Sequence, residues 1–167
     1  MAVILIGIGS NLPHPPAASP QETVAAAVAA LRGIGVYVVA QSSWYASEPV
    51  PASHQPWFVN GVATVAAELD PETLLGRLLA LEKKFGRTRG APNAARTLDL
   101  DLLDYDSLLI DQPTLILPHP RLHLRRFVLE PLCEIAPDWR HPRFDLSATE
   151  LLDRLPSPDQ PVLRLSG

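Results

Sequence analysis

Two hydrophobic periodicities alternate along the chain and predict an alternation of strands and helices. Four segments have the β-branched, aromatic or every-second-residue pattern of strands: residues 2–9, 36–45, 57–68 and 97–105. Two segments between them are alanine-rich or carry apolar residues at helical spacing: residues 20–31 and 71–85. The order β-α-β-β-α-β predicts an α+β fold, a ferredoxin-like (split βαβ) antiparallel sheet with helices packed on one face.

Capping residues set the expected ends of the two helices. Ser19 and Asp70 each precede a proline and are expected N-caps, because their side chains can accept hydrogen bonds from the first turn. Gly33, Gly35 and Gly86 follow the helical patterns and are expected to end them.

The last third of the chain predicts shorter elements. We expect an added strand at 107–110, a loop at 113–126, and helices at 127–135 and 147–155. The first of these helices would hold Pro131 in its first turn, and the second would begin with a capping box of Ser147 and Glu150. Residues 1–167 are expected to form a single domain, with a tail that frays from residue 156.

The strand at 97–105 carries the most distinctive chemistry, in the run Arg-Thr-Leu-Asp-Leu-Asp-Leu-Leu. Asp99 and Asp101 are two residues apart and therefore share one face of a strand, while the leucines between and around them face a core. Adjacent carboxylates repel unless a cation lies between them, and Mg²⁺ takes such oxygen ligands together with substrate phosphates. The alternative is an edge strand with a solvated acidic face, because this alternation is common.

Charge and composition narrow the function. Only two of the fourteen basic residues are lysines, and the arginines cluster between Arg87 and Arg143, which favours bidentate phosphate binding. The net charge of −4 argues against a nucleic-acid or membrane-surface binder. No apolar run reaches the length of a membrane span, and the single cysteine, Cys133, excludes an internal disulfide. We expect a cytoplasmic monomer that binds small molecules.

Four further positions are candidates for ligand binding, and each also has a purely structural explanation. Phe58 and Asn60 share a strand face and could hold a planar heterocycle, although a core aromatic beside a satisfied amide is equally expected. Glu82 near a helix end reads better as a solvated residue. His119, between two prolines, is more often structural than phosphate-binding in such a setting. The glycines before Ser10 are followed by a proline-rich loop, so neither a P-loop nor a dinucleotide-binding turn is present.

Together these residues resemble one family, the 6-hydroxymethyl-7,8-dihydropterin pyrophosphokinases of folate biosynthesis. The matching motifs, in the family's order, are Gly9-Ser10-Asn11-Leu12, Ser43-Trp44-Tyr45, Ser47-Glu48-Pro49, Phe58-Val59-Asn60, Leu81-Glu82, Gly86-Arg87-Thr88-Arg89, Arg96 to Asp101, Leu117 to Arg121 and Arg125 to Leu129. The resemblance implies ATP as co-substrate, two Mg²⁺ ions and transfer of the β,γ-pyrophosphoryl group to the pterin hydroxymethyl, with release of AMP.

The resemblance also implies roles for single residues. Asp99 and Asp101 would hold both metal ions and, with Arg87 and Arg96, form the catalytic set. The implied ATP-binding residues are Glu82, Arg87, Arg89, Arg96, Leu102, His119 and Arg125. The implied pterin-binding residues are Ser47, Pro49, Val50, Phe58, Asn60 and Phe127. Residues 90–95, with the neighbouring Arg87 and Arg89, would form a lid that orders on ATP binding.

Two other functions stay open at the level of sequence. A non-catalytic ferredoxin-like module could bind RNA or a protein, although this would require exposed aromatics on a basic sheet face. A metal-dependent phosphohydrolase could use the same acidic pair, but it would release phosphate without a pterin acceptor.

Overall fold

The computed structural model describes residues 3–12, 19–48, 56–86, 97–156 and 161–165 of the 167-residue chain. The strands are β1 (Ile4–Ser10), β2 (Tyr37–Gln41), β3 (Tyr45–Ser47), β4 (Phe58–Ala66), β5 (Asp99–Tyr105), β6 (Ile110–Gln112), β7 (Leu115–Leu117) and β8 (Val162–Arg164). The helices are α1 (Pro20–Leu31), α2 (Pro71–Lys84), α3 (Arg126–Ile135) and α4 (Ala148–Asp153). Short 3₁₀ turns lie at Arg32–Ile34 and Leu122–Leu124.

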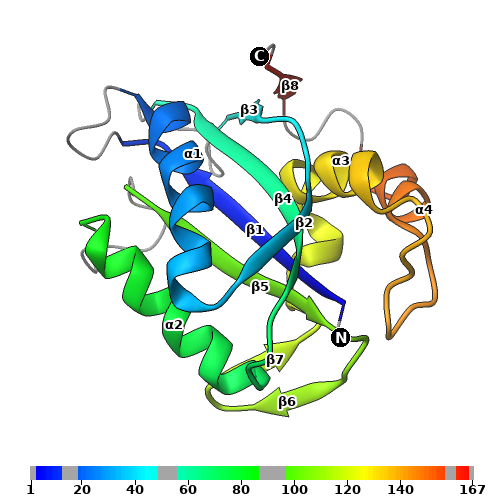
Figure 1. Cartoon of the computed structure of the whole chain (residues 1–167). Helices are drawn as coiled ribbons and strands as arrows, with labels where there is room; N and C mark the ends of the chain where they lie inside the picture. Colours follow the sequence, from blue (N-terminus) through cyan, green and yellow to red (C-terminus); the bar gives the residue numbers. More distant parts are fainter. Residues whose placement is uncertain (1–2, 13–18, 49–55, 87–96, 157–160, 166–167) are drawn as a thin grey trace.

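Six strands form one antiparallel sheet within the described residues. Its order is β5-β1-β4-β3-β8, and β2 pairs with a different part of the long strand β4. β1 therefore lies inside the sheet, between β4 and the edge strand β5 (Figure 1). β6 and β7 form a separate two-stranded hairpin.

The predicted helix caps are confirmed. Ser19 Oγ accepts a hydrogen bond from the N–H of Glu22 at 3.2 Å, and Asp70 Oδ1 accepts one from Thr73 at 2.7 Å. Ser147 and Glu150 form the predicted reciprocal capping box at the start of α4. These local bonds fix where each helix begins, because they satisfy N–H groups that have no partner within the helix.

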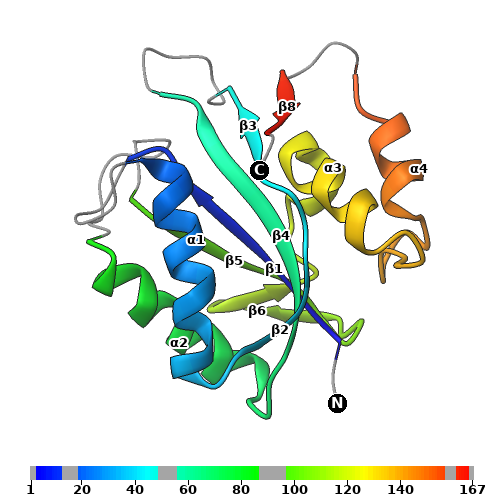
Figure 2. The same ribbon diagram turned by 45° about the horizontal axis from the view of Figure 1, so that its top comes forward.

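Helices cover both faces of the sheet, so the prediction of one covered face is wrong. α1 and α2 pack on one face, whereas α3 and α4 lie on the other (Figure 2). The reason is visible in β1, where every residue is buried: Ile4, Ile6 and Ile8 join the core beneath α1 and α2, and Leu5 joins the core beneath α3 and α4. A central strand that is apolar on both faces needs a cover on each side.

Three segment predictions also need correction. The single strand expected at 36–45 is two strands, β2 and β3; between them the side-chain Oγ of Ser42, and not a backbone carbonyl, accepts the N–H of Val62 at 3.0 Å. The added strand lies at β6, slightly later than expected, and its partner β7 lies within the expected loop. The tail is not wholly frayed, since β8 pairs with β3.

The position of Pro131 differs from the sequence prediction too. α3 begins at Arg126, which makes Pro131 an interior residue of the helix and not a first-turn residue. No helix among the described residues has both the length and the hydropathy that crossing a bilayer requires.

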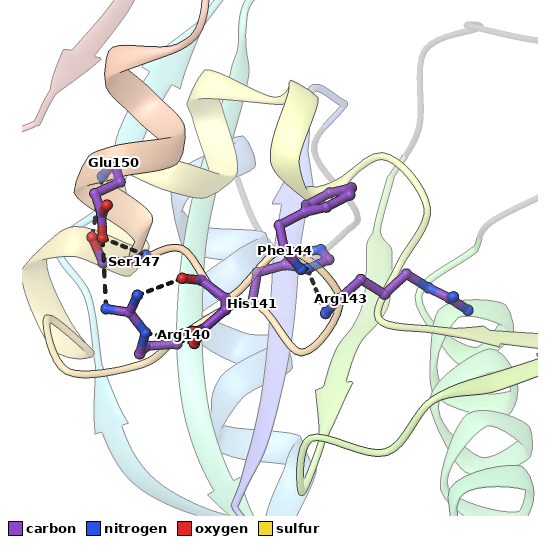
Figure 3. A network of polar contacts seen from close by, with 7 residues as sticks. Arg140, His141, Arg143, Phe144, Ser147 and Glu150 are labelled. Carbon is purple, nitrogen blue, oxygen red and sulfur yellow. Dashed lines mark hydrogen bonds and ion pairs between the residues drawn. The ribbon is translucent and has the colours of Figure 1, made fainter.

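A network of polar contacts lies in the segment that connects α3 to α4 (Figure 3). Arg140 Nε donates to Asp145 Oδ1 at 2.8 Å, and its Nη1 lies 3.6 Å from Glu150 Oε1. His141, almost fully buried, stacks on Phe144 with ring centroids 4.4 Å apart. The network holds the segment that follows α3 against the start of α4, while α3 and α4 themselves pack through a shared apolar core that includes Leu132 and Leu151.

Candidate functional site

Cross-strand register places a row of residues across four neighbouring strands. Tyr45 lies opposite Asn60, Asn60 opposite Gly9, and Gly9 opposite Asp99. Residues directly opposite each other share a sheet face, so all four point toward α3. Val62, Gly7 and Asp101 form the next row. The two aspartates therefore share one face of β5, as the sequence predicts.

Two glycines create the floor of a hollow on this face. Neighbouring strands lie about 4.8 Å apart, and Gly7 and Gly9 leave the space between Asn60 and the acidic pair without side chains. The hollow is lined by Gly7, Ile8, Gly9, Asn60, Gly61, Asp99, Asp101, Phe127 and Val128. A Cβ added to Gly9 would lie 2.7 Å from Asn60 Oδ1, so only glycine leaves the amide in its place.

One wall of the hollow is a buried pair of polar side chains. Asn60 Nδ2 donates to Ser47 Oγ at 2.5 Å, and both residues are buried. Phe58 lies opposite Ser47 in the row beyond Asn60 and is partly exposed. The bond to Ser47 fixes the orientation of the amide, and its Oδ1 lies over Gly9.

The opposite wall is the acidic pair, which is partly buried and has an arginine beside Asp101. Arg125 Nη1 lies 3.4 Å from Asp101 Oδ2, and each side chain keeps about a quarter of its exposure. The Arg125 guanidinium also lies 5.4 Å from the ring centroid of Phe127. The aspartates do lie on an edge strand, but their face borders a hollow beneath α3 and is not a simple solvated surface.

Glu82 is buried, so the expectation of a solvated helix face is wrong. Its Oε2 accepts the backbone N–H of Leu100 at 2.7 Å, which joins the end of α2 to the outer edge of β5. Leu102 is also buried, in the core beneath α1 and α2. Glu82 and Leu102, two of the seven residues in the implied ATP-binding set, are therefore next to the acidic pair at β5.

His119 is held against the same edge of β5. Its backbone N–H donates to the carbonyl of Leu103 at 2.8 Å, and its Nδ1 accepts the N–H of Arg121 at 3.1 Å. Burial, followed by the charge of Arg125, lowers the pKa of His119 to about 4. The ring is therefore neutral at pH 7, and because Nδ1 accepts, the other nitrogen carries the proton and can donate to a ligand.

Several candidate residues lie outside the described part of the chain. These are Pro49 and Val50, in residues 49–55, and Arg87, Arg89 and Arg96, in residues 87–96. The expected lid at 90–95 falls in the same segment. The structure does bring together Ser47, Phe58, Asn60, Asp99, Asp101, Phe127, Arg125 and His119, with Glu82 at the outer edge of β5 and Leu102 on the opposite face of that strand.

Sequence reasoning missed part of the site. Gly7 and Gly9 lie inside β1 and line the hollow, although neither is among the site residues expected from the sequence. A signal was available, because glycines inside a β-branched strand often mark a close approach of a ligand or another chain segment. Val128, which follows Phe127 in α3, carried no such signal.

Comparison with known proteins identifies the family. A family model described as 7,8-dihydro-6-hydroxymethylpterin-pyrophosphokinase (HPPK) matches residues 5–137, most of the chain. The chain belongs to this family. A relative named 2-amino-4-hydroxy-6-hydroxymethyldihydropteridine pyrophosphokinase from Synechocystis sp. is 39% identical over 168 residues, covering 98% of this chain and 83% of the relative. One of the same name from Pseudomonas aeruginosa is 41% identical, covering 83% of each.

Solved structures agree at the level of the fold. The HPPK-DHPS of Plasmodium falciparum, solved with STZ-DHP, matches 91% of this chain with a TM-score of 0.70 at 10% identity. The chain spans 43% of that longer protein. Family membership makes the chain a pyrophosphokinase of folate biosynthesis with ATP as co-substrate, and favours neither the binding module nor the phosphohydrolase.

Proposed function

We propose that the glycine-floored hollow is the active site for transfer of the β,γ-pyrophosphoryl group of ATP to 6-hydroxymethyl-7,8-dihydropterin. The products are AMP and the pterin diphosphate. One observation carries this proposal: the register sets Asn60 and the Asp99–Asp101 pair on opposite sides of Gly7 and Gly9, open to one another. One hollow thereby offers an amide for a heterocycle on one side and carboxylates for a metal-bound triphosphate on the other.

The pterin occupies the side nearer Asn60. The amide offers a donor and an acceptor to a heterocycle edge, and Ser47 fixes its orientation from behind. Phe58 and Phe127 supply aromatic surface for the flat ring from β4 and α3 respectively. Pro49 and Val50 complete the pocket wall in the segment between β3 and β4.

Two Mg²⁺ ions bind at the acidic pair. Among the residues that the structure describes, there is no group of three or more His, Cys, Asp or Glu side chains that could hold a metal ion. Two carboxylates fit Mg²⁺ nonetheless, because this ion commonly takes one or two carboxylates, substrate phosphates and water. When bound, the ions supply charge neutralisation for the triphosphate and alignment for the attacking alcohol. Asp99 and Asp101 hold them.

Positive and neutral donors around the acidic pair bind the nucleotide. Arg125 places a guanidinium beside Asp101, and His119 presents a neutral N–H donor near Asp99. Arg87 and Arg96 clamp the transferring phosphates, and Arg89 acts with residues 90–95 as a lid over ATP. Glu82 acts from the outer edge of β5, and Leu102 from the face of β5 opposite to the aspartates. Phosphoryl transfer requires such positioning and charge stabilisation more than a strong base.

The fold topology, the cellular location and the oligomeric state are also part of this proposal. The β1-α1-β2/β3 and β4-α2-β5 halves, with β1 and β4 adjacent at the centre, support a ferredoxin-like (split βαβ) domain over residues 1–167. We infer a cytoplasmic monomer that binds small molecules and neither nucleic acid nor membrane, consistent with the net charge of −4.

The decisive experiment measures AMP release from Mg-ATP with and without the reduced pterin. We expect AMP only when pterin and Mg²⁺ are both present. Phosphate release without pterin would instead support a phosphohydrolase, and absence of turnover would support a binding module. Hydrogen exchange at 87–96 with a non-hydrolysable ATP analogue tests the lid, which predicts slower exchange on binding.

A further inference from the structure

One carboxylate joins three elements on the α3 side of the sheet. Glu134, near the end of α3, accepts the backbone N–H of Ser43 at 2.9 and 3.1 Å and the Ser43 hydroxyl at 3.1 Å. The Tyr45 hydroxyl donates to Glu134 Oε1 at 2.7 Å. Arg164 of β8 lies 3.7 Å from Oε2. Glu134 therefore fastens α3 to β3 and to the strand beyond it.

The partners of Glu134 lead directly to one wall of the hollow. Tyr45 lies opposite Asn60, and Ser47, two residues further along β3, accepts the hydrogen bond from the Asn60 amide. Any change in the position of β3 would therefore move the group that orients Asn60.

The helix end of this connection leads to the other wall. Phe127 and Glu134 are seven residues apart in α3, which is close to two full turns, so they lie on the same side of the helix. Phe127 lines the hollow from the first turn while Glu134 is anchored in the last. The position of the Phe127 ring therefore depends on how the other end of the helix is held at Glu134.

The bonds at Glu134 are of the strong, charge-assisted kind. Although burial opposes it, hydrogen bonds from Tyr45 and Ser43 hold the pKa of Glu134 below its ordinary value. Burial, then the bond and charge of Glu134, raise the pKa of Tyr45 above its ordinary value. The carboxylate is therefore ionised and the phenol protonated at neutral pH, which is the pairing that gives a short, firm hydrogen bond.

We propose that Glu134 is a positioning residue for the pterin, setting the width of the slot between Phe127 on α3 and Asn60 on the sheet. This inference rests on the proposed function, because it assumes that the pterin binds between those two residues. The acidic pair has an anchor of its own, since Glu82 of α2 holds β5 from the opposite edge, although Arg125 at the start of α3 also pairs with Asp101. Loss of Glu134 should therefore weaken pterin binding much more than ATP binding.

The experiment compares Glu134→Ala, Glu134→Gln and Tyr45→Phe in steady-state kinetics and in equilibrium pterin binding. For Glu134→Ala we expect KM for pterin to rise about tenfold or more, because pterin binding must then also order Phe127 against Asn60. KM for ATP should change less than about twofold. Glu134→Gln should recover most of the pterin affinity, because its amide oxygen still accepts from Ser43.

Controls separate a positioning role from a general loss of stability. Glu130→Ala removes an acid one turn earlier in α3 that pairs with Arg126 at 3.4 Å, and its KM for pterin should match wild type. Tyr45→Phe keeps the ring packing and removes one bond, so it tests the proposal even where Glu134→Ala does not fold. An unchanged KM for pterin in Tyr45→Phe and in folded Glu134→Ala, or equal increases for both substrates, would overturn the inference. If Asn60→Ala also leaves pterin binding unchanged, the proposed pterin site itself is wrong.

Discussion

The Glu82 carboxylate accepts the backbone N–H of Leu100 at 2.7 Å, which joins the last turns of α2 to the outer edge of β5. Leu100 stands between Asp99 and Asp101, so this bond holds the strand at the point where its two carboxylates face the hollow. An edge strand has N–H groups without a neighbouring strand to accept them. Here a buried side chain accepts one of them.

We expect Glu82→Ala to lower the free energy of unfolding by about 1–3 kcal/mol, because it leaves the buried N–H of Leu100 without its acceptor. Turnover should fall as well, since the acidic pair loses its support. Glu82→Gln keeps an acceptor oxygen and should be milder in both respects. Chemical denaturation and AMP release measure the two effects. Lys84→Ala, an exposed change in the same helix, is the control; an equal effect there would contradict the assigned role.

Substitution of Gly9 should affect substrate binding more than folding. In Gly9→Ala the new methyl group would displace the Asn60 amide, 2.7 Å away, but it meets only the end of a side chain that can move. We expect KM for pterin to rise at least about tenfold, from the loss of the oriented amide. Gly33→Ala meets no heavy atom within 4 Å and serves as the matched control. Wild-type pterin binding in Gly9→Ala would mean that Asn60 does not contact the pterin.

The acidic pair should be required for turnover and dispensable for folding. Asp99→Asn and Asp101→Asn preserve shape but remove negative charge, so we expect turnover to fall by roughly two orders of magnitude or more, with a raised Mg²⁺ requirement. Stability should change by less than about 1 kcal/mol, because the pair of Asp101 with Arg125 is partly solvent-exposed. The control is Asp111→Asn, an exposed acid in β6. Near wild-type turnover at saturating Mg²⁺ in either variant would remove the metal role.

His141 should make the fold sensitive to acid. Burial, followed by the charges of His123 and Arg143, lowers the pKa of His141 to about 4, below its unfolded value of about 6.5. Between these values the unfolded chain binds a proton that the folded chain does not, so stability is complete above about pH 6.5 and declines as pH falls toward 4. His141 Nδ1 accepts hydrogen bonds from the backbone N–H groups of Arg143 and Phe144, next to it in Figure 3.

Denaturation curves between pH 7 and 4 measure this dependence. His141→Asn replaces the ring with a group that can accept hydrogen bonds but cannot titrate, so its stability should fall less steeply with acid than that of wild type. His119 has a similarly lowered pKa and remains in both proteins, so some acid dependence should persist. Equal slopes in the two proteins would show that His141 is not a source of the acid sensitivity.

Local signals predicted the elements well, because they depend on contacts within a few residues. Ser19, Asp70 and Ser147 cap the helices that the sequence assigns to them, since a cap bonds only to its own first turn. The shared face of Asp99 and Asp101 follows from strand geometry alone. The motifs around them were enough to indicate the family and its chemistry.

Long-range packing decided the remaining features, which residue spacing does not encode. Glu82 is buried because the end of α2 meets the outer edge of β5, a contact between residues 18 positions apart in the sequence. β8 joins the sheet only because β3 offers an edge. α3 covers the second face because β1 is apolar on both sides.

The sequence by itself determined the strand with its paired aspartates, the capped starts of α1, α2 and α4, and the candidate residues for binding ATP and a pterin. Tertiary structure alone set Asn60 across two glycines from those aspartates, and placed Phe127 above them through a helix anchored at Glu134. The physical reason is that side-chain periodicity is a property of one strand or helix, whereas the width and floor of a site depend on which strands become neighbours and in what register.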